Sequence, residues 1–172
     1  MHFFMKRRKS GLEVLEHAGY IEKFTVIKYK SVDRAYEKKP YDILESICEG
    51  GINCLLNAGI TLLLNLLIAD GDNFAAAEIG VGDDATAASA AQTDLLDAGA
   101  EWAAMEATFP SVADQTVTFQ GQFGDGEAEF HWQECAVKQA TGVTTVLNRV
   151  VADKGTKAAG EVWSAKLQIT LT

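Results

Sequence analysis

His131 and Cys135 are the most reactive pair of side chains in the sequence, and they lie four residues apart in AEFHWQECAV (128–137). On a helix this spacing would place both side chains on one face, where they could share a metal ion. The segment alternates apolar and polar residues, however, which predicts a strand, and in a strand the two would stand about 13 Å apart. The whole chain has only three histidines and three cysteines. We therefore predict no metal cluster and no cofactor.

Glu134 is the acidic residue of greatest interest in the same segment. Strict alternation places it on the same side as Trp132, so its carboxylate is predicted to be directed into the core. A buried carboxylate needs a partner, and Arg149 on the following predicted strand is the nearest candidate in sequence. We predict a structural ion pair between Glu134 and Arg149. The alternative is a catalytic carboxylate, for which Glu101 or Glu106 would have to act as a second acid.

The segment IGVGDDATAASAAQTDL (79–95) has the glycines and carboxylates of a ligand-binding loop. It contains neither G-x-x-x-x-G-K-[ST] nor G-x-G-x-x-G, so a phosphate site is not indicated. It also lacks the residue order of a calcium loop, as does DGDN (70–73), although a surface calcium site stays open. No G-x-S-x-G nucleophile motif occurs in the chain. We predict that the protein is not an enzyme, that these glycines serve backbone geometry, and that the small residues let a neighbouring subunit come close.

The charge is divided unevenly along the chain. Residues 1–40 carry ten lysines and arginines against five acidic residues, whereas residues 41–172 carry five against nineteen. The basic cluster Lys6, Arg7, Arg8 and Lys9 could bind nucleic acid, an anionic membrane or the acidic body of another copy. The acidic body argues against wrapping by nucleic acid, and no aromatic residues alternate with the basic ones. We expect this cluster to dock on another subunit, with a solvated arm as the alternative.

The cysteines and the apolar segments indicate the compartment. Cys48, Cys54 and Cys135 are odd in number and form no C-x-x-C motif, which is typical of buried free thiols. The N-terminal residues do not have the charge order of a secretory signal, so synthesis in the host cytoplasm is expected. The apolar stretch Ile52–Asp70 approaches the length of a membrane span, but asparagines and a threonine recur at every fourth position. We predict a buried helix there and no membrane partner.

The remaining hydrophobic pattern is that of strands. Apolar and polar residues alternate in short segments separated by glycine-containing turns, which is typical of an antiparallel sandwich. The predicted strands span residues 22–30, 77–82, 101–110, 116–123, 128–137, 144–151 and 162–172, and residues 31–43 are predicted as a loop. The predicted fold is mainly β: an antiparallel β-sandwich with one buried apolar helix and an N-terminal basic arm. Residues 1–45 would form the arm with one strand, and residues 46–172 the helix and the sandwich.

The order of several short motifs adds a family resemblance. These motifs are GINCLLNAGI (51–60), IGVGDDATAASAAQTDL (79–95), MEATFP (105–110), TFQGQFGDGEAEFHWQE (118–134), LNRVV (147–151), GTKAAGEVW (155–163) and ITLT (169–172). The sequence from about residue 50 onward resembles a family of small virion proteins of tailed bacteriophages and related prophages. A related pattern occurs in the attachment domains of phage tail-fibre proteins.

The resemblance implies a non-enzymatic virion component with a β-sandwich, used in many copies per particle. One hypothesis is a capsid decoration or cement protein, forming a trimer that docks between subunits on the head. The alternative is a tail or fibre adaptor, with a carbohydrate-binding face as one option. Its expected partners are other copies of itself and the major capsid or tail proteins, with no nucleic acid. A sugar-binding platform would require exposed rings among Trp102, Trp132 and Trp163.

Overall fold

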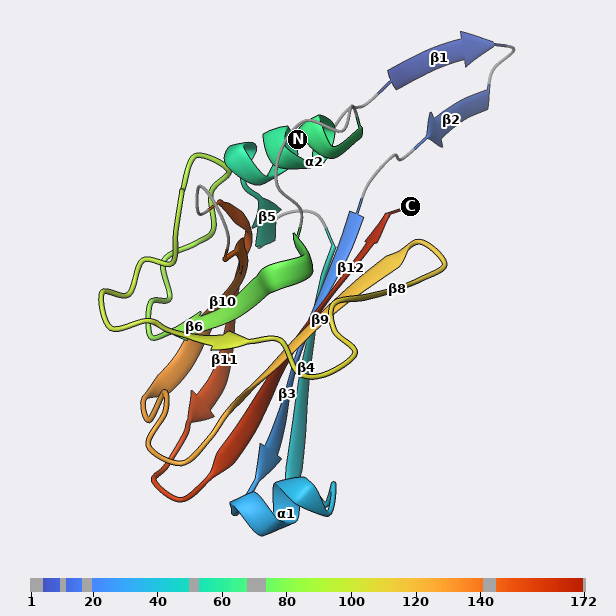
Figure 1. Ribbon diagram of the computed structural model, residues 1–172. Coiled ribbons are helices and arrows are strands. Elements are labelled where there is room, and N and C mark those ends of the chain that lie inside the picture. The colour runs from blue at the N-terminus through green and yellow to red at the C-terminus, as the bar shows by residue number, and fades with distance from the viewer. Residues whose placement is uncertain are drawn as a thin grey trace.

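A computed structural model of the protein describes residues 5–9, 12–16, 20–49, 53–67, 74–140 and 145–171. Two five-stranded antiparallel sheets form its body (Figure 1). The first, here called the β11 sheet, has the strand order β5 (Asn53–Leu55), β11 (Val146–Thr156), β10 (His131–Gln139), β6 (Ala77–Gly82) and β7 (Glu101–Ala104). The second, the β12 sheet, has the order β4 (Asp42–Glu49), β3 (Tyr20–Tyr29), β12 (Val162–Leu171), β9 (Thr116–Phe123) and β8 (Ser111–Ala113).

The remaining elements lie outside these two sheets. They are the hairpin strands β1 (Met5–Lys9) and β2 (Leu12–Glu16), the helices α1 (Val32–Tyr36) and α2 (Asn57–Leu67), and the short 3-10 helix η1 (Phe74–Ala76). The mainly β, antiparallel, sandwich-like architecture predicted from the sequence is confirmed. Strand β9 has the predicted bounds, and β6 and β12 agree with their predicted spans to within one residue.

The core lies between the two sheets and is rich in aromatic side chains. Alternate residues of β12, among them Trp163 and Leu167, are buried there, as the sequence pattern predicts. The indole of Trp132 contacts Phe123 and Trp163 edge-on, with ring centroids 5.0 Å apart in both pairs. Its Nε1 donates to the carbonyl of Ala128 at 2.9 Å, so the one polar atom of this buried ring is satisfied.

The predicted boundary between residues 45 and 46 is wrong, because it falls inside β4. Strand β3 is hydrogen-bonded to β12 on one side and to β4 on the other, so the sandwich begins at Tyr20. The segment predicted as a loop contains α1, whose N-cap Ser31 accepts a bond from the Arg34 N–H at 3.4 Å, and the start of β4. In the described part of the predicted arm, the β1–β2 hairpin and α1 lie outside the two large sheets.

The predicted apolar helix is present but shorter and less buried than expected. Its first residues form β5, and α2 then covers part of the β11 sheet beside β11. Leu62 is buried, whereas Leu63 and Leu64 are exposed, so the helix has one free apolar face. No helix in the described ranges is long and apolar enough to cross a membrane.

Gly59 allows α2 to lie against the sheet. A Cβ at this position would stand 2.3 Å from the backbone oxygen of Leu147. We expect Gly59→Ala to lower the free energy of unfolding by about 1–3 kcal/mol, because steric overlap with backbone outweighs the gain of about 1 kcal/mol in helix propensity. Urea denaturation followed by circular dichroism would measure this. Gly99→Ala is the matched control, since its Cβ would meet only the Asp97 carboxylate at 3.5 Å. Equal stability of the two variants would contradict the close-contact argument.

Candidate functional site: a buried ion pair beneath a surface loop

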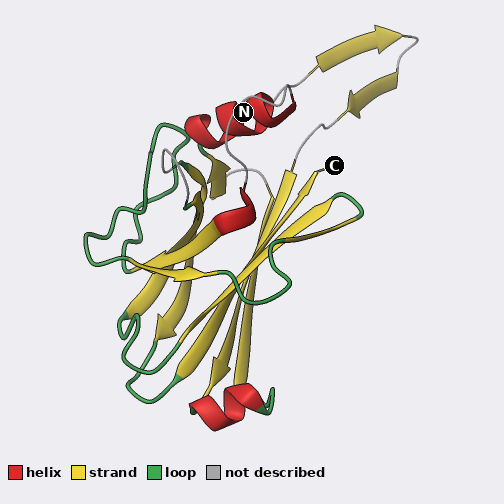
Figure 2. Cartoon of the chain, viewed as in Figure 1, coloured by secondary structure: helices red, strands yellow, loops and turns green. Residues whose placement is uncertain are grey.

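A long segment without helix or strand connects β6 to β7, as the sequence predicts for most of it. It spans residues 83–100 and runs as a loop beside the β11 sheet (Figure 2). A short apolar cluster lies between loop and sheet: Leu95 packs with Leu56, Ala136 and Val146. This cluster is separate from the core between the sheets, so the loop has its own packing surface.

Glu134 and Arg149 meet directly under this loop. The Arg149 Nε donates to Glu134 Oε2 at 2.5 Å, and both side chains are completely buried. The carboxylate also accepts backbone N–H bonds from Leu96 (3.1 Å) and Asp97 (2.8 Å). Its charge is therefore balanced by one cation and solvated by two loop amides, as a buried carboxylate requires.

The other nitrogens of Arg149 bind the first half of the loop. Nη1 donates to the Thr86 carbonyl at 2.7 Å and to Gln92 Oε1 at 3.3 Å, and Nη2 to Asp84 Oδ1 at 3.1 Å. Asp84 in turn accepts from the Thr86 N–H. That bond, and then the Arg149 charge, hold the pKa of the Asp84 carboxyl below its usual value. The Arg149 guanidinium thus binds residues 84–92 of the loop, and the Glu134 carboxylate binds residues 96 and 97.

The pair lies on the outer face of the β11 sheet and not in the core between the sheets, so the predicted direction of Glu134 is wrong. Trp132, Cys135 and Val137 belong to the core between the sheets, which breaks strict alternation along β10. The register of β10 against β11 shifts between Trp132 and Glu134. This irregularity turns Glu134 to the side of Ala136, which is the side that the loop covers.

Two glycines of β6 leave room for side chains on this outer face. A Cβ at Gly82 would stand 2.5 Å from Glu134 Oε1, and a Cβ at Gly80 would stand 2.6 Å from the ring of Trp102. Neither glycine has a positive φ. The prediction that they serve backbone geometry is therefore wrong: they permit close approach of the buried carboxylate and of an indole ring.

The other candidate residues do not join this site. His131 is bonded through Nε2 to Asp153 Oδ1 at 2.7 Å, whereas Cys135 is fully buried in the inner core, where burial raises the pKa of its thiol. Glu106 accepts from Gln120 and Ser164 of the β12 sheet instead of facing Glu134. Among the residues with described positions, no group of three metal-ligating side chains occurs.

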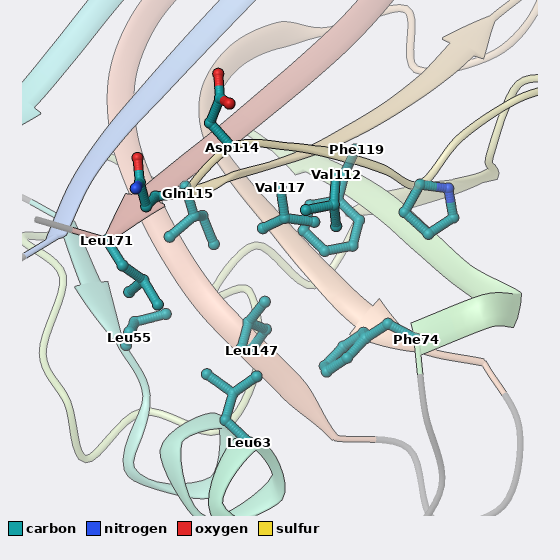
Figure 3. A pocket seen from close by; sticks show the side chains of 12 residues that line it. Leu55, Leu63, Phe74, Val112, Asp114, Gln115, Val117, Phe119, Leu147 and Leu171 are labelled. Atoms are coloured by element: carbon teal, nitrogen blue, oxygen red, sulfur yellow. The ribbon is translucent and has the colours of Figure 1, made fainter. Parts of the chain in front are cut away.

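An apolar pocket of about 440 Å³ opens elsewhere, between one end of the two sheets and α2 (Figure 3). It is lined by Leu55, Leu63, Phe74, Pro110, Val112, Asp114, Gln115, Val117, Phe119, Leu147, Ile169 and Leu171. Among these lining side chains only that of Asp114 is ionisable. The pocket therefore offers apolar contact and no pair of groups for acid–base chemistry.

Sequence reasoning missed a buried carboxylate, Glu22. It lies on the inner side of β3 with Phe24 and Val26 and is completely buried. Neither of its carboxyl oxygens has a hydrogen-bond partner within the described part of the chain, and the same holds for Nδ2 of Asn148. Its spacing of two and four residues from apolar core positions was a signal that could have identified it.

The predicted docking residues all lie in β1: Lys6, Arg7, Arg8 and Lys9. The structure does not describe their side chains, nor those of Cys48 and Cys54. A comparison of the chain with protein-family models, with curated proteins and with solved structures finds no match.

Proposed function

We propose that the chain is a non-enzymatic structural protein of a tailed-bacteriophage virion, a capsid decoration or cement protein that docks between subunits on the head. The observation that carries this proposal is the contact between the motifs of the family resemblance. Gly82 of IGVG, Glu134 of the F-x-W-x-E segment and Arg149 of LNR meet in one place. There they fasten a surface loop and contact one another, which is the use expected of such residues in a structural protein.

The charge division supports the same role. The basic residues of β1 lie in a hairpin outside the two sheets, whereas the part of the chain that forms the sandwich is acidic overall. A basic arm and an acidic body are complementary surfaces for repeated contacts between copies or with a shell. Residues Lys6, Arg7, Arg8 and Lys9 are the proposed docking residues.

The carbohydrate-binding option receives no support from the tryptophans. Trp132 and Trp163 are buried. Trp102 lies against Gly80, and the ammonium of Lys138 stands 4.1 Å from the centre of its ring. The stacking faces that a sugar platform uses are therefore occupied.

The number of copies per particle tests the proposal. In purified particles we expect hundreds of copies, counted by quantitative mass spectrometry against the major capsid protein, because a cement protein repeats with the shell lattice. A few to a dozen copies would favour the tail or fibre adaptor instead. Particles that lack the chain altogether would overturn the virion assignment.

A further inference from the structure

Strand β4 is the longest edge strand of the two large sheets in the described part of the chain. In the described part of the chain the two large sheets end at four strands, and three of these are only three or four residues long: β5, β7 and β8. Strand β4 has eight residues, pairs only with β3, and keeps a continuous register over its whole contact with β3. It contains no proline and no basic residue. Proteins usually block edges with short strands, charged side chains (especially lysines), prolines or bulges; β4 has no lysine, proline or bulge, and its charges are all acidic.

The outer face of β4 also carries exposed apolar side chains. Ile43 and Ile47 are 52% and 62% exposed. Ile43 is paired with the half-buried Ile27 of β3, so the apolar surface continues onto the next strand. Between the two isoleucines Glu45 is paired with Lys23 at 2.7 Å. A strand added to this edge would cover apolar surface as well as satisfy backbone groups.

The acidic residues of β4 indicate what kind of strand could be added to its edge. Strand β4 carries three acidic residues, Asp42, Glu45 and Glu49. If a second β4 paired with it in the antiparallel register that matches Ile43 with Ile47, Glu45 would stand opposite its own copy, and like charges facing each other destabilise a pair. A basic strand avoids this repulsion and gains attraction instead.

The hairpin β1–β2 supplies such a strand. The sequence of β1, MKRRK, has four basic residues in five. One edge of β1 pairs with β2, and its other edge has no partner strand among the described residues. The hairpin extends away from the two sheets (Figure 1) and does not pair with β4 of its own copy. The long aliphatic stems of lysine and arginine are also suited to cover the two isoleucines.

We propose that β1 of one copy adds to the free edge of β4 in a second copy and extends its β12 sheet by the hairpin. This assignment rests on the proposed role of the arm in joining copies. It is, however, a property of the purified chain, so its test and the count of copies per particle can fail independently. A contact of this kind is heterologous, and it closes into a ring or continues as a chain of copies.

A charge exchange in the full-length protein tests the proposal. In sedimentation velocity we expect the wild-type chain to associate, and Arg7→Glu with Arg8→Glu to weaken association at least about tenfold, as does raising the salt from about 0.05 to 0.5 M. Glu45→Arg with Glu49→Arg should weaken it similarly. Mixing the two variants should restore a complex, because the unchanged arm of the second matches the unchanged edge of the first, and the reversed arm of the first matches the reversed edge of the second.

The matched control is Arg34→Glu with Lys38→Glu, which makes the same charge change on exposed body residues and should associate like the wild type. Circular dichroism would verify that each variant is folded. A monomeric wild-type chain, or a mixture that fails to associate, would overturn the proposal. So would association that survives arm reversal but is lost in Ile47→Lys, since that result indicates pairing of two β4 strands.

Discussion

Replacing Arg149 with methionine is expected to lower the free energy of unfolding by about 3–5 kcal/mol, because it leaves the carboxylate of Glu134 buried without its cation. Four loop groups would lose a donor at the same time: the Thr86 carbonyl, Gln92 Oε1, and both the carbonyl and the carboxylate of Asp84. We therefore expect the loop 83–100 to open before the sandwich unfolds. Urea denaturation measures the first effect. Hydrogen exchange at the amides of Leu96 and Asp97, which donate to Glu134, measures the second.

A double-mutant cycle separates the ion pair from a general loss of packing. Adding Glu134→Gln to Arg149→Met removes the uncompensated charge and keeps an acceptor for one of the two loop amides, so the double variant should be more stable than the two single effects predict. Arg34→Met is the matched control. Arg34 is exposed and stands 3.6 Å from Glu37, a surface pair worth about 1 kcal/mol at most. If Arg149→Met lowered the free energy of unfolding no more than Arg34→Met does, the stabilising role of the Glu134–Arg149 ion pair would be refuted.

Most strands were predictable from the sequence, because a strand with one buried face shows an apolar period of two wherever its register is regular. Strand β12 is the best example, with its alternate residues Trp163, Ala165, Leu167 and Ile169 all buried. Strand β4 was missed because its outward residues Ile43 and Ile47 are apolar as well, so the segment shows no contrast between its faces. The first residues of the apolar segment 52–70 became β5 because β11 offers them a strand partner, which is a tertiary effect.

The site was predictable in its partners but not in its position. The requirement that a buried carboxylate find a cation depends only on residue type and burial, and it identified Glu134 and Arg149. Their position on the outer face depends on a shift of register in β10, and no local sequence pattern predicts this shift. The loop groups that Arg149 binds are backbone carbonyls and polar side chains 57 to 65 residues away in sequence, with no spacing rule to indicate them.

Glu22→Gln is expected to stabilise the protein, by an amount that grows with pH. Burial raises the pKa of the Glu22 carboxyl from 4.5 to about 8, and the nearby amide of Asn148 offsets only part of this shift. Because the folded-state pKa lies above the unfolded one, the carboxyl contributes its full stability below about pH 4.5. That contribution is lost as the pH rises through 8, at about 1.4 kcal/mol per pH unit. The glutamine variant has no such titration.

The two proteins should therefore be equally stable at about pH 4 and differ by about 3 kcal/mol at pH 7, which is an upper figure for one buried group. Urea denaturation across this pH range gives the curve. Glu101→Gln is the matched control: this glutamate on β7 is partly exposed, and the variant should follow the wild-type curve within about 0.5 kcal/mol. A constant difference between wild type and Glu22→Gln would contradict this, because it would mean that the pKa of Glu22 is the same in the folded and unfolded states. A slope of the expected sign would show that the protein keeps an unpaired carboxyl in its core at the expense of stability above neutral pH.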